Sequence, residues 1–246
     1  MRLRVVLVEP MYEGNVGSVA RAMKNFGFQD LVLVNPCPIE DLGLAMASHA
    51  KDLLLGARRA SSIDEAIEGA DLVVGTTGKR LGREQRHMRL YLRAPCLTPE
   101  ELSERLRDRE GTVALLLGRE DCGLHSRELA LCDMLVSIPT SHDYPVMNLS
   151  HASAVLLYEL SSLDGGEIGL ASREIQQLLL ERSRALLREI GYPSHKLEFT
   201  VLMLRRIFGR AGLTEREARA LLGIIKGVCW RIGSRRQEER DHRALR

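Results

Sequence analysis

Short apolar runs alternate along the first two thirds of the chain with segments whose apolar positions recur at helical spacing. Runs rich in Val and Leu are typical of strands buried on both faces of a parallel sheet. Alternation with helices predicts an α/β fold with a mostly parallel sheet and helices on both faces. The expected strands are 4–9, 31–35, 71–75, 112–117 and 134–138, and the expected helices are 15–26, 42–55, 62–68, 98–106, 124–130 and 152–160.

Several residues stand where an element should begin or end. Asn15 is expected to cap the first helix, and Asn148 or Ser150 the helix after the last strand. Gly27 suits the position just past a helix, where a left-handed backbone is common. Pro139 has no backbone N–H, so we expect it to stop the strand 134–138.

The last third of the chain has a different pattern. Asp164, Gly165 and Gly166 are typical of a linker, and three helical patterns follow at 172–190, 195–210 and 214–232. The sequence therefore predicts a first domain over 1–163 and a small helical domain over 168–246. The charged residues from 234 onward are expected to fray.

Composition is compatible with a sizeable core, because 45% of the 246 residues are hydrophobic. The net charge of +2 is unevenly spread. From residue 168 onward there are 17 Lys/Arg against 9 Asp/Glu, and the remainder holds 18 against 24. A basic tail suggests a polyanion as partner, and a solvated arginine-rich helical face explains it equally well.

Several classes of protein are disfavoured by the sequence. No stretch approaches the roughly 20 apolar residues of a membrane helix, and the N-terminus lacks a signal-peptide cleavage pattern. The five cysteines are scattered without Cys-x-x-Cys spacing, which argues against a disulfide framework or a zinc site. We expect a reduced, cytoplasmic, soluble protein that binds neither metal nor membrane.

Three loops at the carboxyl ends of predicted strands are candidates for a ligand site, because ligands of parallel sheets bind there. They are 75–78, 118–123 and 139–148. None carries a dinucleotide-binding fingerprint or a P-loop. The segment 76–93 holds six Lys/Arg against Glu84 alone, so it can close over an anionic substrate or be a solvated crossover loop.

Three separated motifs belong together. The first is Asn-Val-Gly-Ser-Val-Ala-Arg-Ala-Met-Lys-Asn-Phe-Gly at 15–27, and the second is Leu-Leu-Leu-Gly-Arg-Glu-Asp-Cys-Gly-Leu at 115–124. The third combines Ile-Pro-Thr at 138–140, Tyr144, and Asn-Leu-Ser-His-Ala at 148–152. In this order they resemble the SPOUT methyltransferases, most closely the SpoU division and its TrmJ-like tRNA 2′-O-methyltransferases. The resemblance covers roughly residues 5–160, and the helical tail looks like the extra domain of that branch.

The resemblance implies a SPOUT fold whose C-terminal part forms a trefoil knot, with S-adenosyl-L-methionine held in the knot loops. It also implies a homodimer whose subunits complete each other's sites. The substrate would be tRNA, methylated on the ribose 2′-hydroxyl at position 32 of the anticodon loop. Val146 stands where bacterial relatives often have serine. Whether cytidine alone or also uridine is accepted therefore stays open.

Site residues carry over from the resemblance position by position. Arg21 would be the catalytic arginine. In the mechanism proposed for the family, this arginine assists deprotonation of the ribose hydroxyl. Because guanidinium stays protonated, we expect Arg21 instead to fix a phosphate and stabilise charge on the attacking oxygen. Three polar residues would hold the loops and Arg21 in place: Asn15, Glu120 and Asn148. Ordinary capping of loops explains these polar residues as well, and the two roles are compatible. The cofactor-binding positions would be Thr76, Thr77, Gly78, Gly118, Ile138, Pro145, Val146 and Met147.

Two other functions remain open. One keeps the fold and changes the RNA, as in a SpoU-type 2′-O-methyltransferase acting on rRNA or on another tRNA position. The other belongs to a different class, a non-catalytic RNA-binding protein that kept the fold. The presence of Arg21, Asn15, Glu120 and Asn148 weighs against it.

Overall fold

The computed structural model describes residues 1–78, 95–107, 109–141, 143–161 and 169–244, with side chains described as far as residue 233. It divides into two compact units, Met1–Gly169 and Leu170–Arg246. The basic residues of 79–93 and the linker 164–166 lie outside the described residues, so the expectations for them remain predictions.

The described part of the first unit contains a six-stranded sheet in the order β3-β2-β1-β5-β4-β6, and every pairing is parallel. The expected α/β class is thus confirmed. All five predicted strands are present, and β3 is an additional edge strand of three residues. The strands are β1 (Arg2–Val8), β2 (Asp30–Val34), β3 (Arg58–Ala60), β4 (Leu72–Thr76), β5 (Thr112–Leu117) and β6 (Met134–Val136).

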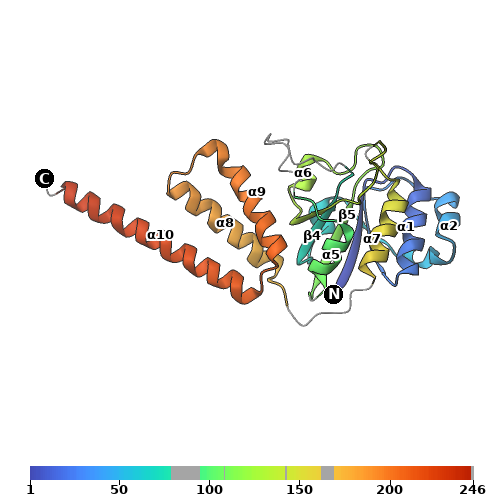
Figure 1. The fold of residues 1–246 in the computed structure, drawn as a ribbon, viewed down its shortest axis with the longest axis horizontal. Helices are drawn as coiled ribbons and strands as arrows, with labels where there is room; N and C mark the ends of the chain where they lie inside the picture. The colour runs from blue at the N-terminus through green and yellow to red at the C-terminus, as the bar shows by residue number, and fades with distance from the viewer. Residues whose placement is uncertain (79–94, 108, 142, 162–168, 245–246) are drawn as a thin grey trace. The chain divides into compact units, whose positions relative to one another are not determined.

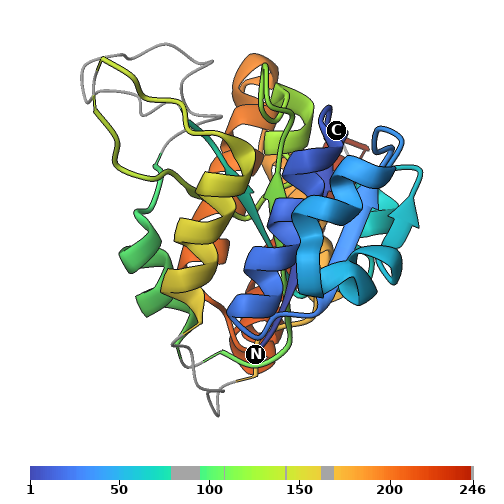
Figure 2. The same cartoon turned by 90° about the vertical axis from the view of Figure 1, so that its right-hand side faces the viewer.

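Helices cover both faces of this sheet (Figures 1 and 2). Figure 2 shows α7, α1 and α2 side by side along one face, where their apolar residues share a core with Leu7, Leu115 and Val136. The other face packs Val6 and Leu116 against α4 and α6. The helices are α1 (Glu13–Asn25), α2 (Asp41–Ala47), α3 (Lys51–Leu55), α4 (Ile63–Ala66), α5 (Pro99–Leu106), α6 (Ser126–Leu129) and α7 (Leu149–Leu160), with a 3₁₀ turn over Ser48–Ala50.

The start of α1 differs from the prediction. The N-cap position is Tyr12, which makes no side-chain cap, and Asn15 lies inside the first turn. Asn15 was therefore wrongly assigned as the cap, because its side chain bonds to Glu120 instead. Gly27, by contrast, has φ +81°, as expected after a helix.

Two further boundaries differ. The segment predicted as one helix over 42–55 is broken into three pieces, and Ser48 has φ +52° at the break. The last strand ends at Val136, two residues before the expected boundary, which leaves Ile138 in the loop.

α1 and α2 approach each other closely. A Cβ added to Gly17 would overlap the carbonyl oxygen of Gly43, so the two backbones are in contact there. Glu13 supports the same junction, because its Oε2 accepts hydrogen bonds from the backbone N–H groups of Glu40 and Gly43 over 2.5 and 2.9 Å. The helix that carries Asn15 and Arg21 is thereby fixed against α2.

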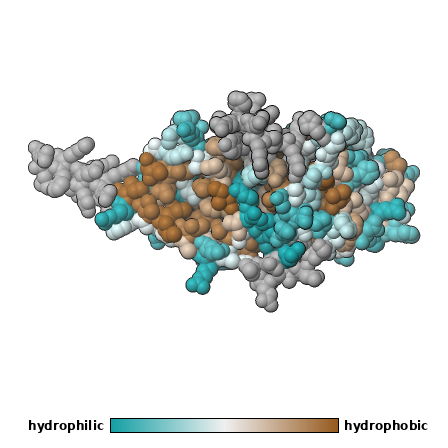
Figure 3. Space-filling view, viewed as in Figure 1, coloured by the Kyte–Doolittle hydropathy of each residue, from teal (hydrophilic) through white to brown (hydrophobic). Residues whose placement is uncertain are grey.

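The second unit consists of α8 (Arg173–Glu189), α9 (Ser194–Ala211) and α10 (Glu215–Ala244). Its small core contains Ala171, Leu179 and Ala218. α10 extends to residue 244, although the sequence pattern predicts an end at 232. Apolar side chains also gather on the surface of these helices, and Ile224 and Trp230 are among the exposed ones (Figure 3). No helix among the described residues is long and apolar enough to cross a membrane.

Candidate functional site

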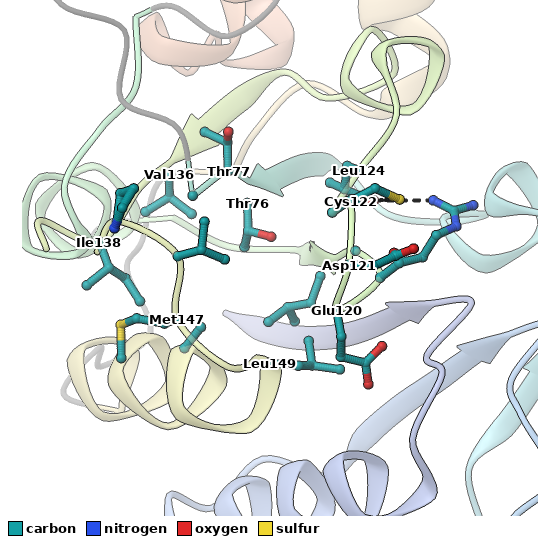
Figure 4. Close-up of a pocket in the computed structure, with 18 of the residues that line it drawn as sticks. Thr76, Thr77, Glu120, Asp121, Cys122, Leu124, Val136, Ile138, Met147 and Leu149 are labelled. Atoms are coloured by element: carbon teal, nitrogen blue, oxygen red, sulfur yellow. Dashed lines mark hydrogen bonds between the residues drawn. The ribbon is translucent and has the colours of Figure 1, made fainter. Parts of the chain in front are cut away.

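A pocket of about 320 Å³ lies where the carboxyl ends of β4, β5 and β6 meet (Figure 4). Its volume falls at the lower end of the roughly 300–1,000 Å³ of small-molecule sites. The structure brings all eight predicted cofactor positions to its wall: Thr76, Thr77, Gly78, Gly118, Ile138, Pro145, Val146 and Met147. Leu149, Ala152 and Leu156 of α7 complete an apolar side.

The loops that form the pocket are tied down by local hydrogen bonds. Thr76 donates its hydroxyl to the carbonyl of Leu116 over 3.0 Å, and the backbone N–H of Thr77 donates to Val136 over 3.0 Å. Thr140 donates its hydroxyl to the carbonyl of Pro145 over 2.8 Å, which closes the loop after β6. The hydroxyl groups thus support the loops, while backbone and apolar groups dominate the wall.

The turn after β5 is folded back on itself. A Cβ added to Gly118 would overlap the backbone of Gly123 and Leu124, so only glycine fits there. The N–H of Gly123 donates to the carbonyl of Arg119 over 2.9 Å, and Gly123 itself has φ +69°. This turn, residues 118–123, forms the pocket wall next to β5.

Glu120 leaves this turn and bonds to the start of α1. Its Oε2 accepts from the backbone N–H of Met11 over 2.8 Å, and Oε1 accepts from that of Tyr12 over 3.3 Å. Oε1 also accepts from the side-chain amide of Asn15 over 2.9 Å. A carboxylate 105 residues from Asn15 in sequence therefore holds the segment that leads into α1, and Asn15 bonds to this carboxylate instead of capping the helix.

Asn148 extends the same network to α7. Its Nδ2 donates to Oδ1 of Asn15 over 3.1 Å, and its Oδ1 accepts from the N–H of Ser150 over 2.8 Å. Asn148 is thus the N-cap of α7, one of the two residues predicted for that role. The three motifs meet through the side chains of Glu120, Asn15 and Asn148.

Arg21 is the one predicted site residue that the structure leaves apart. It is exposed on α1 and does not line the pocket. Within the described part of the chain it makes no hydrogen bond or ion pair. Its guanidinium group is therefore available to a partner molecule.

Sequence reasoning missed a charged cluster directly behind the pocket wall. Arg119 lines the pocket and forms ion pairs with Glu9 and Glu128. Burial of Glu128 opposes its ionised form, but hydrogen bonds from Arg119 and the N–H of His125 outweigh burial and lower its pKa. The signal available in the sequence was an arginine placed between Gly118 and Glu120 at a strand end.

Cys122 is an exposed thiol in the same lining. Its hydrogen bond with Asp121 raises its pKa, so the neutral thiol is favoured and the residue is a poor nucleophile. Among the described residues, no group of three or more His, Cys, Asp or Glu side chains is placed to hold a metal ion.

A second groove, of about 800 Å³, lies beside the network on its outer side. It is lined by Asn15 and Asn148 together with Tyr12, Met46 and His151. The two asparagines line this groove and not the pocket, whereas Glu120, to which Asn15 bonds, lines the pocket.

The sequence matches the family model described as "SpoU rRNA Methylase family" over residues 2–158. A relative from Methanocaldococcus jannaschii, named tRNA (cytidine-2′-O-)-methyltransferase TrmJ, is 39% identical over 91% of this chain and 98% of its own length. A relative from Pectobacterium atrosepticum, named tRNA (cytidine/uridine-2′-O-)-methyltransferase TrmJ, is 34% identical over 92% and 96%.

A solved structure supports the same relationship. The crystal structure of TrmJ from Z. mobilis ZM4 superposes with a TM-score of 0.70 at 27% identity, covering 93% of this chain and 99% of that one. The resemblance inferred from the three motifs is confirmed. The chain belongs to the SpoU methylase family.

Proposed function

We propose that this protein transfers a methyl group from S-adenosyl-L-methionine to a ribose 2′-hydroxyl of tRNA. One observation carries the proposal: the eight positions matched to the cofactor site line a single pocket. Side-chain hydrogen bonds join the three motifs to one another through Asn15, Glu120 and Asn148. The relatives named as tRNA 2′-O-methyltransferases align over nearly the whole chain, including the helical unit.

The pocket fits the chemistry of S-adenosyl-L-methionine. Ile138, Val146 and Met147 offer apolar contacts suited to adenine, and Gly78 and Gly118 let the backbone approach a ligand closely. The carboxylates of Glu120 and Asp121 in the lining complement a sulfonium cation and an ammonium group. When bound, the cofactor supplies an electrophilic methyl group.

Arg21 is the candidate catalytic residue. Methyl transfer requires in-line approach of the ribose oxygen and removal of its proton. A guanidinium remains protonated, so Arg21 serves by binding a neighbouring phosphate and stabilising negative charge on the oxygen. Asn15, Glu120 and Asn148 hold α1, which carries Arg21, against the pocket loops.

A homodimer explains why Arg21 lies outside the pocket of its own subunit. Arg21 is exposed on α1, and the neighbouring helix α7 exposes Val155 and Tyr158, the latter to 66%. We propose that this surface pairs with a second copy, so that Arg21 serves the partner's pocket. Trefoil knotting of the pocket loops, implied by the resemblance, remains a prediction.

The anticodon-loop position 32 is the proposed site of methylation. The helical unit, with its surplus of Lys and Arg, is the proposed tRNA-binding domain, which matches the expected polyanion partner. A tRNA substrate would place the protein in the cytoplasm. The relatives differ in the bases that their names print, so the accepted base is an outcome of the test.

The test is methylation of total tRNA by the purified protein with S-adenosyl-L-methionine, followed by mapping of 2′-O-methylated nucleotides. We expect a mark at position 32 and none on rRNA supplied in parallel. A 2′-O-methyl group elsewhere in tRNA, or on rRNA, would show that the proposed substrate position is wrong, while the proposed reaction would still hold. Absence of cofactor binding by calorimetry, even with tRNA present, would favour a non-catalytic RNA-binding protein.

A further inference from the structure

Arg119 is a nearly buried arginine that none of the three motif roles explains. Its side chain is 8% exposed, and its partners Glu9 and Glu128 are 43% and 5% exposed. We propose that Arg119 is a positioning residue, which sets the placement of α1 relative to the pocket by anchoring the turn 118–123 to α6 and to the loop between β1 and α1. This inference rests on the proposed methyl transfer at that pocket.

The geometry uses the full fork of the guanidinium. Nη1 and Nη2 donate to the two carboxylate oxygens of Glu128, each over 3.0 Å, and Nε donates to Oε2 of Glu9 over 2.9 Å. Nη1 also donates to the carbonyl of Gly123 over 3.3 Å, within its own turn. Such bidentate, charge-assisted bonds fix direction as well as distance.

The neighbouring residue completes a double attachment. Arg119 binds Glu9, while Glu120 binds the N–H groups of Met11 and Tyr12 just beyond it. In the first attachment the loop between β1 and α1 supplies the carboxylate of Glu9. In the second it supplies the backbone N–H groups of Met11 and Tyr12. Two attachments on either side of Pro10 prevent this loop from pivoting, so the start of α1 is held at one position.

The backbone at Glu9 supports this assignment. Glu9 has φ +46°, a conformation that is costly for a residue with a Cβ and that persists only where the surroundings enforce it. The ion pair with Arg119 is such an enforcing contact. On the other side, Glu128 is itself fixed, because its Oε2 accepts from the N–H of His125 over 2.7 Å.

The test compares Arg119→Lys with the control Asp71→Asn. Asp71 accepts a hydrogen bond from the N–H of Thr112 over 2.8 Å at the opposite, amino ends of the strands, so its loss affects stability far from the pocket. Cofactor affinity by calorimetry, kcat and KM for tRNA are measured well below the melting temperature of each variant. A lysine lacks the planar fork that bonds both oxygens of Glu128 together with Oε2 of Glu9, so we expect kcat to fall about 10- to 100-fold while Asp71→Asn stays near wild type.

Equal kinetics of Arg119→Lys and Asp71→Asn would overturn the positioning role. If Arg119→Lys fails to fold, Glu9→Ala is the decisive variant, because it keeps the buried pair of Arg119 with Glu128 and removes only the attachment to the loop between β1 and α1. We expect Glu9→Ala to lower kcat with little change in KM, and wild-type kinetics would overturn the proposal. An inactive wild-type protein would instead refute the proposed function itself.

Discussion

Asn148 donates its side-chain amide to Oδ1 of Asn15 over 3.1 Å, across 133 positions of sequence. The same side chain caps α7 through its own Oδ1, which accepts from Ser150. One residue thus joins two helices, and its two roles use different atoms.

The variant Asn148→Asp separates those roles. An aspartate keeps the acceptor for the cap and loses the donor to Asn15, so we expect stability close to wild type and a clear loss of methylation. Asn148→Ala should lose both roles and about 1 kcal/mol of stability in addition. Thermal melts and initial methylation rates measure the two effects, and undiminished methylation by Asn148→Asp would show that the link to Asn15 is dispensable.

Gly118→Ala should abolish cofactor binding, because the added Cβ would overlap the backbone of Gly123 and Leu124 and force the pocket turn open. The matched control is Gly223→Ala in α10, where nothing lies within 4 Å of the added Cβ. The control should bind the cofactor like wild type and gain up to about 1 kcal/mol in helix stability. Calorimetry measures affinity, and normal binding by Gly118→Ala would contradict the close packing of this turn.

Arg21→Lys should lower kcat while leaving cofactor affinity unchanged, because Arg21 does not line the pocket and lysine lacks a planar fork. Single-turnover methylation and calorimetry distinguish the two quantities. Near-normal turnover by the lysine variant would rule out a bidentate role for the guanidinium.

Mixed dimers test whether Arg21 serves the partner's pocket. Arg21→Ala and Gly118→Ala are each expected to be inactive alone. When the two variants are refolded together, random pairing would make about half of the dimers heterodimers. Each heterodimer would have one intact site of two, so the mixture would show about a quarter of wild-type activity. Activity that never rises above that of the separate variants would contradict a shared site.

Glu128 should make folding stability dependent on pH. Its pKa is lowered from the ordinary 4.5, so its stabilising contribution is present above that value and is lost as the pH falls through the lowered folded-state pKa. We expect the difference in unfolding free energy between wild type and Glu128→Gln to narrow below about pH 4.5. Urea unfolding at a series of pH values measures it, and a constant difference would contradict the role of the carboxylate charge.

The sequence pattern was sufficient for five of the six described strands, because each lies in an apolar run that can be recognised in the sequence. It could not reveal β3, where two of three residues are arginines and the strand exists only through its pairing with β2. The cap of α1 was misassigned because Asn15 lies inside the first turn, where its side chain bonds to Glu120, 105 residues away in sequence.

The pocket positions came from the motif resemblance and not from periodicity. Neither the resemblance nor the periodicity predicted the ion pairs of Arg119. Its partner Glu9 is 110 residues away, and the pair forms only when β1 and β5 are neighbours. Long-range charge pairing of this kind depends on strand order, which local patterns do not encode.

The order of the strands has a consequence for synthesis of the protein. β1 and β2 can pair early, but β1 completes its other edge only with β5, and the pocket gains its last wall from Leu149 to Leu156 of α7. A nascent chain on the ribosome therefore has no binding site until its first unit is almost entirely translated. Fragments that end before α7 would lack affinity for the cofactor, whatever fraction of the sheet they form.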